Sequence, residues 1–169
     1  MKLVLEKARE QHIQEVCELV NVAYRGEEGW TKETDFVEGE RASITEIEGY
    51  LADPNAHLLI CINNNEIVSC ICIEKNDGGV YIGLFAVHPK LQGTGLGKEI
   101  LSQAEDYASR ELKAKKYVMV VLSQRKELIE YYERRGYVRI GNKKEYPVHL
   151  NVGTPLRNDL TIEYLEKIA

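Results

Sequence analysis

The stretch from Val80 to Lys98 reads VYIGLFAVHPKLQGTGLGK, and the rest of the chain is interpreted around it. Its first eight residues form an apolar run long enough for a buried strand, which His88-Pro89 ends because proline donates no backbone N–H. Glycines 93, 95 and 97 follow, and Leu96 to Leu112 has the pattern of an amphipathic helix. A strand, a glycine loop and a helix N-terminus together predict a binding site for phosphate.

Two common phosphate loops do not fit this stretch. The pattern GxxxxGK[ST] needs a glycine where Gln92 stands and a hydroxyl side chain where Glu99 stands. The dinucleotide fingerprint GxGxxG differs from the GxGxG spacing seen here, and no acidic ribose partner follows at the expected place. The loop therefore predicts a phosphate ligand of another class.

Composition sets broad limits on fold and function. At 169 residues the chain is expected to form one domain over 1–169, and its net charge of −5 disfavours nucleic acid as a partner. No apolar run reaches membrane-spanning length, and we expect a cytoplasmic protein without a membrane partner. The four cysteines lie in apolar contexts typical of reduced core residues. Cys70-x-Cys72 lacks companion ligands, so we expect no metal.

An acidic segment from Arg25 to Arg41 has two interpretations. It is rich in glutamate, including Glu28 and Glu33, and it contains the only tryptophan, Trp30. It is either a solvated acidic loop anchored by Trp30 or a lid over a cationic amine. The sequence alone leaves both open.

The remaining periodicity predicts an α/β fold. A meander of strands over 57–62, 66–74 and 80–87 is joined by Asn63-Asn64-Asn65 and by the turn at 76–79. A strand over 117–122 follows the helix at 96–112, which predicts a parallel, right-handed crossover. Further strands are predicted at 2–8, from Tyr137 onward and at 160–165. Helices are predicted at 11–24, at 45–52 with Ser43 or Thr45 as the cap, and at 126–135. The segment 147–158 is predicted to be irregular.

Two motifs resemble one known family. Gln92-x-x-Gly95-x-Gly97 resembles the (Arg/Gln)-x-x-Gly-x-(Gly/Ala) signature of the GNAT superfamily of acyl-CoA N-acyltransferases. The segment from Leu128 to Tyr137 is similar to the family pattern in which a helix ends in Tyr-Glu-(Lys/Arg)-x-Gly-(Phe/Tyr). The resemblance is specific over 80–98 and 128–138 and architectural elsewhere. The acidic loop from Glu27 to Arg41 also resembles a group of small acetyltransferases within the superfamily.

The resemblance implies a fold and a cofactor. The fold would be a mixed, mostly antiparallel sheet flanked by helices, and the co-substrate would be acetyl-CoA. The backbone of Phe85, Ala86 and Val87 would pair with the pantetheine arm, as an added strand does. The pyrophosphate would lie on the loop that Gln92 precedes, formed by Gly93, Thr94, Gly95, Leu96, Gly97 and Lys98. The alternative is a tight turn that binds nothing.

The resemblance also implies catalytic roles. Tyr132 would protonate the departing thiolate, whereas without the resemblance it is a core-packing residue; its neighbour Tyr131 is expected to face elsewhere. Tyr81 stands where several members carry a glutamate base, and we place it with Glu28 and Trp30 as a candidate for substrate binding. The base is left open among Glu28, Glu33, His88 and water. Arg125 replaces an asparagine that contacts the cofactor in many members, and its role is also open.

The function expected from the resemblance is transfer of an acetyl group from acetyl-CoA to an amine, by direct attack in a ternary complex. The acidic segment favours a small polyamine-like acceptor, while a protein amino group stays open, as does a homodimer. The rival interpretations are a non-catalytic acyl-CoA-binding or regulatory module and a structural interaction domain.

Overall fold

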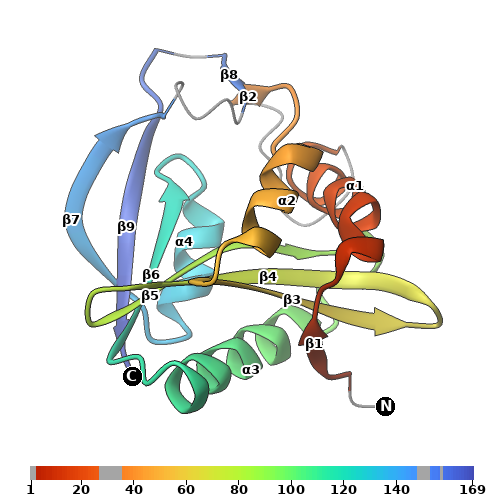
Figure 1. Cartoon of the computed structure of the whole chain (residues 1–169). Helices are drawn as coiled ribbons and strands as arrows, with labels where there is room; N and C mark the ends of the chain where they lie inside the picture. The colour runs from red at the N-terminus through yellow and green to blue at the C-terminus, as the bar shows by residue number, and fades with distance from the viewer. Residues whose placement is uncertain (1–2, 27–35, 148–152, 157) are drawn as a thin grey trace.

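The computed structural model describes residues 3–26, 36–147, 153–156 and 158–169. Its centre is a seven-stranded sheet in the order β1-β3-β4-β5-β6-β9-β7, in which β5 and β6 are parallel and the other neighbours are antiparallel (Figure 1). The strands are β1 (Leu5–Lys7), β3 (Ala56–Asn63), β4 (Glu66–Asn76), β5 (Gly79–Val87), β6 (Lys116–Leu122), β7 (Val138–Glu145) and β9 (Thr161–Ile168). The predicted α/β fold, its meander and its parallel crossover are confirmed.

Four α-helices flank this sheet in the described residues. They are α1 (Ile13–Arg25), α2 (Ile44–Ala52), α3 (Leu96–Glu111) and α4 (Lys126–Glu133), with short 3-10 turns η1 (Glu10–His12) and η2 (Pro89–Leu91). The side chain of Ser43 accepts a hydrogen bond from the N–H of Glu46 at 3.1 Å, so Ser43 is the cap of α2. No helix in the described ranges combines the length and the apolar character that a bilayer crossing requires.

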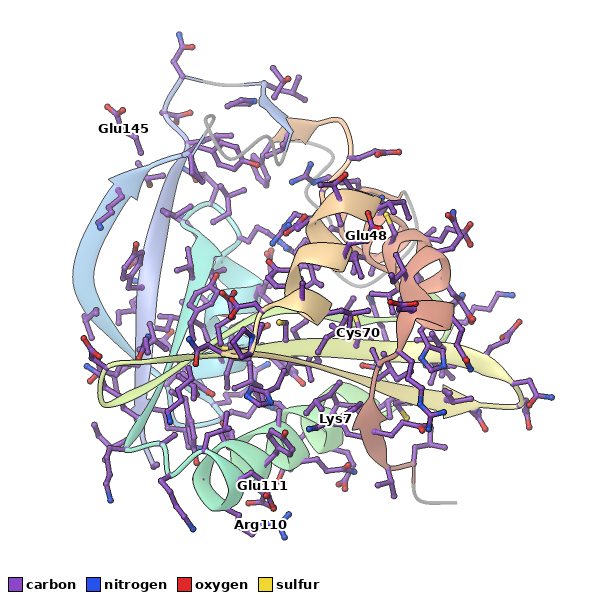
Figure 2. All side chains as sticks on the ribbon, in the orientation of Figure 1. Lys7, Glu48, Cys70, Arg110, Glu111 and Glu145 are labelled. Atoms are coloured by element: carbon purple, nitrogen blue, oxygen red, sulfur yellow. The ribbon has the colours of Figure 1, made fainter. Side chains whose placement is uncertain are left out.

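The core forms two layers, one on each face of the sheet. One layer joins α1 and α2 to the sheet through residues such as Val20, Ile47 and Cys70, and the other joins α3 and α4 through residues such as Ile100 and Ile129. Side chains fill both spaces, whereas Arg110, Glu111 and Glu145 lie at the periphery (Figure 2). All four cysteines are buried and free, as expected of reduced core thiols.

A bulge in β5 decides which of its side chains face the α3/α4 layer of the core. The register with β4 passes from Cys72–Gly83 to Cys70–Ala86, so β5 carries one extra residue there, and Leu84 has a φ of 49°. Ile82 before the bulge and Phe85 after it therefore both pack on the α3/α4 layer, while Leu84 joins the α1/α2 layer. Strict alternation would have placed Ile82 and Phe85 on opposite faces.

The parallel pair β5–β6 separates after a short contact. Its register pairs are Val80 with Tyr117 and Tyr81 with Val118. The strands themselves continue to Val87 and Leu122, and these later residues are not paired with each other in the described chain. The sheet is therefore split at its centre, on the side where the glycine loop follows β5.

Two segments predicted without regular structure contain short strands. The segments predicted as loop and as irregular chain contribute β2 (Val37–Glu38) and β8 (Thr154–Pro155), which pair antiparallel as a small separate sheet (Figure 1). Neither strand has a period to detect, because each is two residues long and depends on its distant partner. The first strand is also shorter than the predicted 2–8, since β1 pairs with β3 over Leu5–Lys7.

Glu105 of α3 connects the helix layer to β9 and to the residue that precedes β7. Its carboxylate accepts hydrogen bonds from the hydroxyl of Tyr137 at 2.8 Å and from the ammonium of Lys167 at 2.9 Å. Tyr137 is 2% exposed, so this phenol is a buried donor whose acceptor carries a negative charge. Burial and the Glu105 carboxylate both raise the pKa of Tyr137.

Buried phenols make the fold sensitive to alkaline pH. Burial also raises the pKa values of Tyr50 and Tyr132, so these groups stay protonated in the folded chain after they ionise in the unfolded chain near pH 10. The stability is therefore complete below pH 10 and falls above it, by about 1.4 kcal/mol per pH unit for each such group. We expect urea unfolding between pH 8 and 11 to show this fall. Tyr137→Phe should be less stable at pH 8 but lose less stability per pH unit, and equal slopes would contradict the assignment.

Candidate active site

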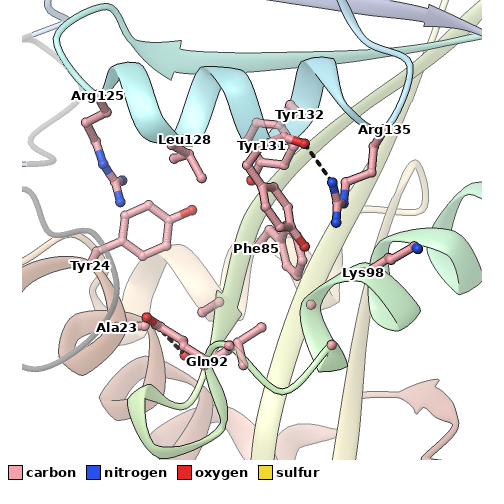
Figure 3. Close-up of a pocket in the computed structure, with 15 residues that line it drawn as sticks. Ala23, Tyr24, Phe85, Gln92, Lys98, Arg125, Leu128, Tyr131, Tyr132 and Arg135 are labelled. Atoms are coloured by element: carbon pink, nitrogen blue, oxygen red, sulfur yellow. Dashed lines mark hydrogen bonds between the residues drawn. The ribbon is translucent and has the colours of Figure 1, made fainter.

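A cavity of about 370 Å³ opens where β5 and β6 separate (Figure 3). Phe85, Ala86 and Val87 of β5 form one wall. The loop before α3 contributes a second wall and α4 a third, while Ala23 and Tyr24 at the end of α1 close one end. The cavity is therefore built from four segments that are distant in sequence.

The glycine loop has a backbone conformation that favours glycine at two positions. Gly93 and Gly95 have φ values of 79° and 90°, and Gly95 is the N-cap of α3. The side chain of Gln92 donates to the carbonyl of Val87 at 3.1 Å and so fastens the loop to the end of β5. The first N–H groups of α3 have no acceptor within the helix, and they follow this loop at the cavity wall. The arrangement favours a negatively charged ligand.

Helix α4 presents one stripe of side chains to the cavity. Leu128, Tyr131, Tyr132 and Arg135 recur at the spacing of one helical face and all line it, and Arg125 lies at the N-cap. The structure thus adds Leu128 and Arg135 to the predicted site residues, and their i, i+3, i+4, i+7 spacing was the available signal. Tyr24 and Ala23 had no such signal, because only the tertiary fold brings the end of α1 to the cavity.

Tyr132 combines a buried ring with a place at the cavity wall. Its side chain is 6% exposed and stacks edge-on against Tyr131 and Tyr137, with ring centroids 5.5 and 6.0 Å away. Burial raises the pKa of Tyr132, and the positive charge of Arg125 opposes the shift only in part. The phenol is therefore neutral throughout the physiological range and can donate a hydrogen bond there.

Tyr131 corrects one prediction. It was expected to face away from the site, yet it lines the same cavity as Tyr132. Its hydroxyl lies 3.1 Å from the position that a Cβ on Gly97 would occupy, so its ring spans from α4 to the start of α3. Tyr131 and Tyr132 can line one cavity because side chains at adjacent helix positions differ in direction by only about 100°. Tyr131 is unsuitable as a control for Tyr132.

The other predicted residues divide into three groups. Gln92, Gly93, Gly95, Gly97 and Lys98 line one cavity with Phe85, Ala86 and Val87, and their predicted role in cofactor binding stays a prediction. The side chains of Thr94 and Leu96 do not line it: Thr94 donates its hydroxyl to the carbonyl of Leu91, and Leu96 packs on the core. Glu28, Glu33 and Trp30 lie outside the described residues, so the predicted lid stays a prediction.

Tyr81 and His88 lie away from the cavity lining. The ring of Tyr81 lies over Gly83, whose Cβ position would be 2.7 Å from Tyr81 Cε1, and burial raises the pKa of Tyr81 to about 12. The Nδ1 of His88 accepts from the N–H of Lys90 at 3.2 Å, where it caps η2 at the end of β5. Neither residue is placed by the structure among those that surround the cavity.

The charged residues of the cavity wall are all cations. They are Lys98, Arg125 and Arg135, and no aspartate or glutamate occurs among the described residues that line it. Tyr131 and Tyr132 form a tyrosine pair near the middle of the cavity. Arg125 extends toward Tyr24 on one side of this pair, whereas Arg135 and Lys98 lie on the other side (Figure 3). A chain with a net charge of −5 thus has a positive cavity, which suits an elongated ligand with anionic groups.

A family comparison agrees with this geometry. The family model described as an acetyltransferase (GNAT) domain matches residues 22–147, which include the cavity walls from Ala23 to Arg135. The chain belongs to the GNAT acetyltransferase family. No curated protein in the comparison matches it.

Solved GNAT structures share the fold of this chain. An N-acetyltransferase from Staphylococcus aureus Mu50 has a TM-score of 0.75 at 13% identity, covering 99% of this chain and 98% of that one. Spermidine N-acetyltransferase from Vibrio cholerae in complex with CoA and spermine has a TM-score of 0.72 at 15% identity, covering 98% and 95%. The ribosomal-protein-S18-alanine N-acetyltransferase from Escherichia coli has a TM-score of 0.73 at 11% identity, covering 99% and 94%.

Proposed function

We propose that this GNAT protein transfers the acetyl group of acetyl-CoA to an amine by direct attack in a ternary complex. The observation that carries the proposal is the cavity at the split between β5 and β6, which joins the glycine loop of α3 to Tyr132 of α4. Acetyl-CoA has matching parts: phosphates for the loop, a pantetheine arm for the free edge of β5, and a thioester for the tyrosine end.

The binding role of β5 follows from its unpaired edge. Beyond Tyr81 the strand pairs with no described residue on the β6 side, and Phe85, Ala86 and Val87 line the cavity there. An extended pantetheine arm carries two amide groups, which can pair with this backbone as an added strand would. The pyrophosphate would then reach the N–H groups at the start of α3.

The chemistry needs one bond to form and one to break. The neutral amine nitrogen attacks the thioester carbonyl, the C–S bond breaks, and the sulfur leaves as a thiolate while the amine loses a proton. Tyr132 stays neutral because burial raises its pKa, so it can donate a hydrogen bond to the sulfur as charge develops there. Because a thiol is normally the stronger acid, this role is stabilisation by a hydrogen bond rather than full proton transfer.

Deprotonation of the amine is the open step. The described residues that line the cavity include no carboxylate and no histidine, so water or a group from 27–35 would take this proton. This observation favours one rival, a non-catalytic acyl-CoA-binding module that keeps the cofactor site. Turnover with a panel of amines separates the two proposals, because the module would bind acetyl-CoA without consuming it.

The acetyl donor is proposed to be acetyl-CoA, whereas two classes of amine are proposed as the acetyl acceptor. Related folds are known both for a polyamine enzyme and for one that acts on a protein alanine, so both classes belong in the panel. The acidic segment of the sequence favours a polyamine-like amine. A location in the cytoplasm and a homodimer stay predictions.

Acetyl-CoA binding tests the proposed site first. Calorimetric titration should show binding of acetyl-CoA, with ATP and NAD as controls that bind more weakly or not at all. If neither acetyl-CoA nor a longer acyl-CoA binds, the glycine loop is only a turn and both the enzyme and the module proposals fall.

Gly95→Glu should abolish this binding. The substitution introduces a negative side chain at the start of α3 and places it at a φ of 90°, which L residues rarely adopt. Gly78→Glu is the matched control, because Gly78 has a φ of 79° in an exposed turn outside the cavity. Undiminished affinity of Gly95→Glu in the same titration would remove the loop from the cofactor site.

Tyr132→Phe should reduce kcat by about a hundredfold, the usual loss when one donor to a developing charge is removed. The affinity for acetyl-CoA should stay nearly unchanged, because the ring and its packing remain. Steady-state kinetics and calorimetry measure the two effects separately. Tyr107→Phe, on α3 and outside this cavity, is the matched control. Full activity of Tyr132→Phe would take the hydroxyl out of the mechanism.

A further inference from the structure

Arg135 occupies an unusual place at the phosphate end of the cavity. It follows the last turn of α4, lines the cavity opposite the glycine loop, and makes no ion pair with any residue that the structure describes. Its positive charge is therefore not neutralised within the described chain. A partly buried guanidinium normally has an anionic partner, since an unpaired charge in a protein cavity is unfavourable.

The guanidinium of Arg135 is held in one orientation by Tyr131. Its central carbon lies 4.0 Å from the centroid of the Tyr131 ring, and its Nη1 donates to the Tyr131 carbonyl at 3.1 Å (Figure 3). Its Nε is buried and has no hydrogen-bond partner in the described chain. A guanidinium held this way loses little freedom when a ligand oxygen arrives at its remaining Nη donors.

Tyr131 also connects Arg135 to the glycine loop. Its ring face supports the guanidinium, while its hydroxyl reaches to 3.1 Å from the Cβ position of Gly97. Tyr131 therefore contacts both the guanidinium and the start of α3. Lys98, the third residue of α3, lines the same end of the cavity. An anion there would meet helix N–H groups on one side and a fixed guanidinium on the other.

We propose that Arg135, positioned by Tyr131, is a second phosphate-binding group that acts across the cavity from the glycine loop and strengthens selection for the phosphorylated end of CoA. This inference rests on the proposed function, since CoA supplies the phosphate. CoA has a pyrophosphate and a 3′-phosphate, and either can accept the two-point hydrogen bonds that arginine donates. The adjacent Arg134 is exposed and outside the cavity lining.

The test compares two variants that remove the same charge. Calorimetric titration with CoA should give a dissociation constant about tenfold higher for Arg135→Gln, the loss expected for one charge-assisted contact. Arg134→Gln should stay within about twofold of the unaltered protein. Arg135→Lys should recover part of the loss, because it keeps the charge but not the planar, two-point geometry.

Dephospho-CoA, which lacks the 3′-phosphate, identifies the phosphate group. A loss in Arg135→Gln for CoA but not for dephospho-CoA assigns the contact to the 3′-phosphate, and an equal loss for both assigns it to the pyrophosphate. Tyr131→Leu should weaken CoA binding similarly, and the double variant should lose little more than either single one, because both changes disable the same guanidinium.

The outcomes separate this inference from the proposed function. If the unaltered protein binds CoA and Arg135→Gln binds it equally well, the second phosphate contact is wrong and the enzyme proposal stands. An equal loss in Arg134→Gln would also overturn it, because the effect would then be general charge attraction. If the unaltered protein does not bind CoA, the proposed function itself fails. Thermal unfolding of each variant confirms that the folded state is being compared.

Discussion

The early separation of β5 from β6 is the constraint on which the rest of the structure depends. Two register pairs hold the strands together, and beyond them the centre of the sheet presents backbone edges that pair with no neighbouring strand in the described chain. Unpaired backbone N–H and C=O groups in the middle of a sheet are unfavourable unless other groups fill the space between the separated strands. Helices α3 and α4 fill part of it, and the remaining space is the cavity lined by Phe85 to Val87.

The same two helices provide both the core and the site. Buried faces of α3 and α4 pack on the sheet through residues such as Ile100, Ala104 and Ile129. Their cavity-facing residues are the glycine loop at the start of α3 and the tyrosine stripe of α4. Because Glu105 links α3 to Tyr137 and Lys167, the end of α4 and the last strand are fastened to the helix that carries the loop. The geometry of the site is therefore supported by a close-packed interior.

The local charge of the cavity differs from the charge of the chain. A net charge of −5 indicates little about the ligand, whereas the cavity wall contains three cations and no acidic residue among the described positions. Lys98 and Arg135 lie at one end and Arg125 at the other, with the tyrosine pair between them (Figure 3). This distribution matches a ligand with anionic groups at one end and a reacting carbonyl near the tyrosines.

The sequence by itself determined the elements and the family. Period-two and period-3.6 patterns located the meander, the long helix and the crossover, because each has a buried face that its own residues encode. The glycine loop and the helix predicted to end before Gly136 indicated two of the segments that line the cavity, since their glycines reflect local backbone needs. Tertiary structure alone decided the bulge at Leu84, the β2–β8 pair, and the meeting of Tyr24, Tyr131 and Arg135 at one cavity. These features depend on contacts between segments far apart in the chain, which no local pattern records.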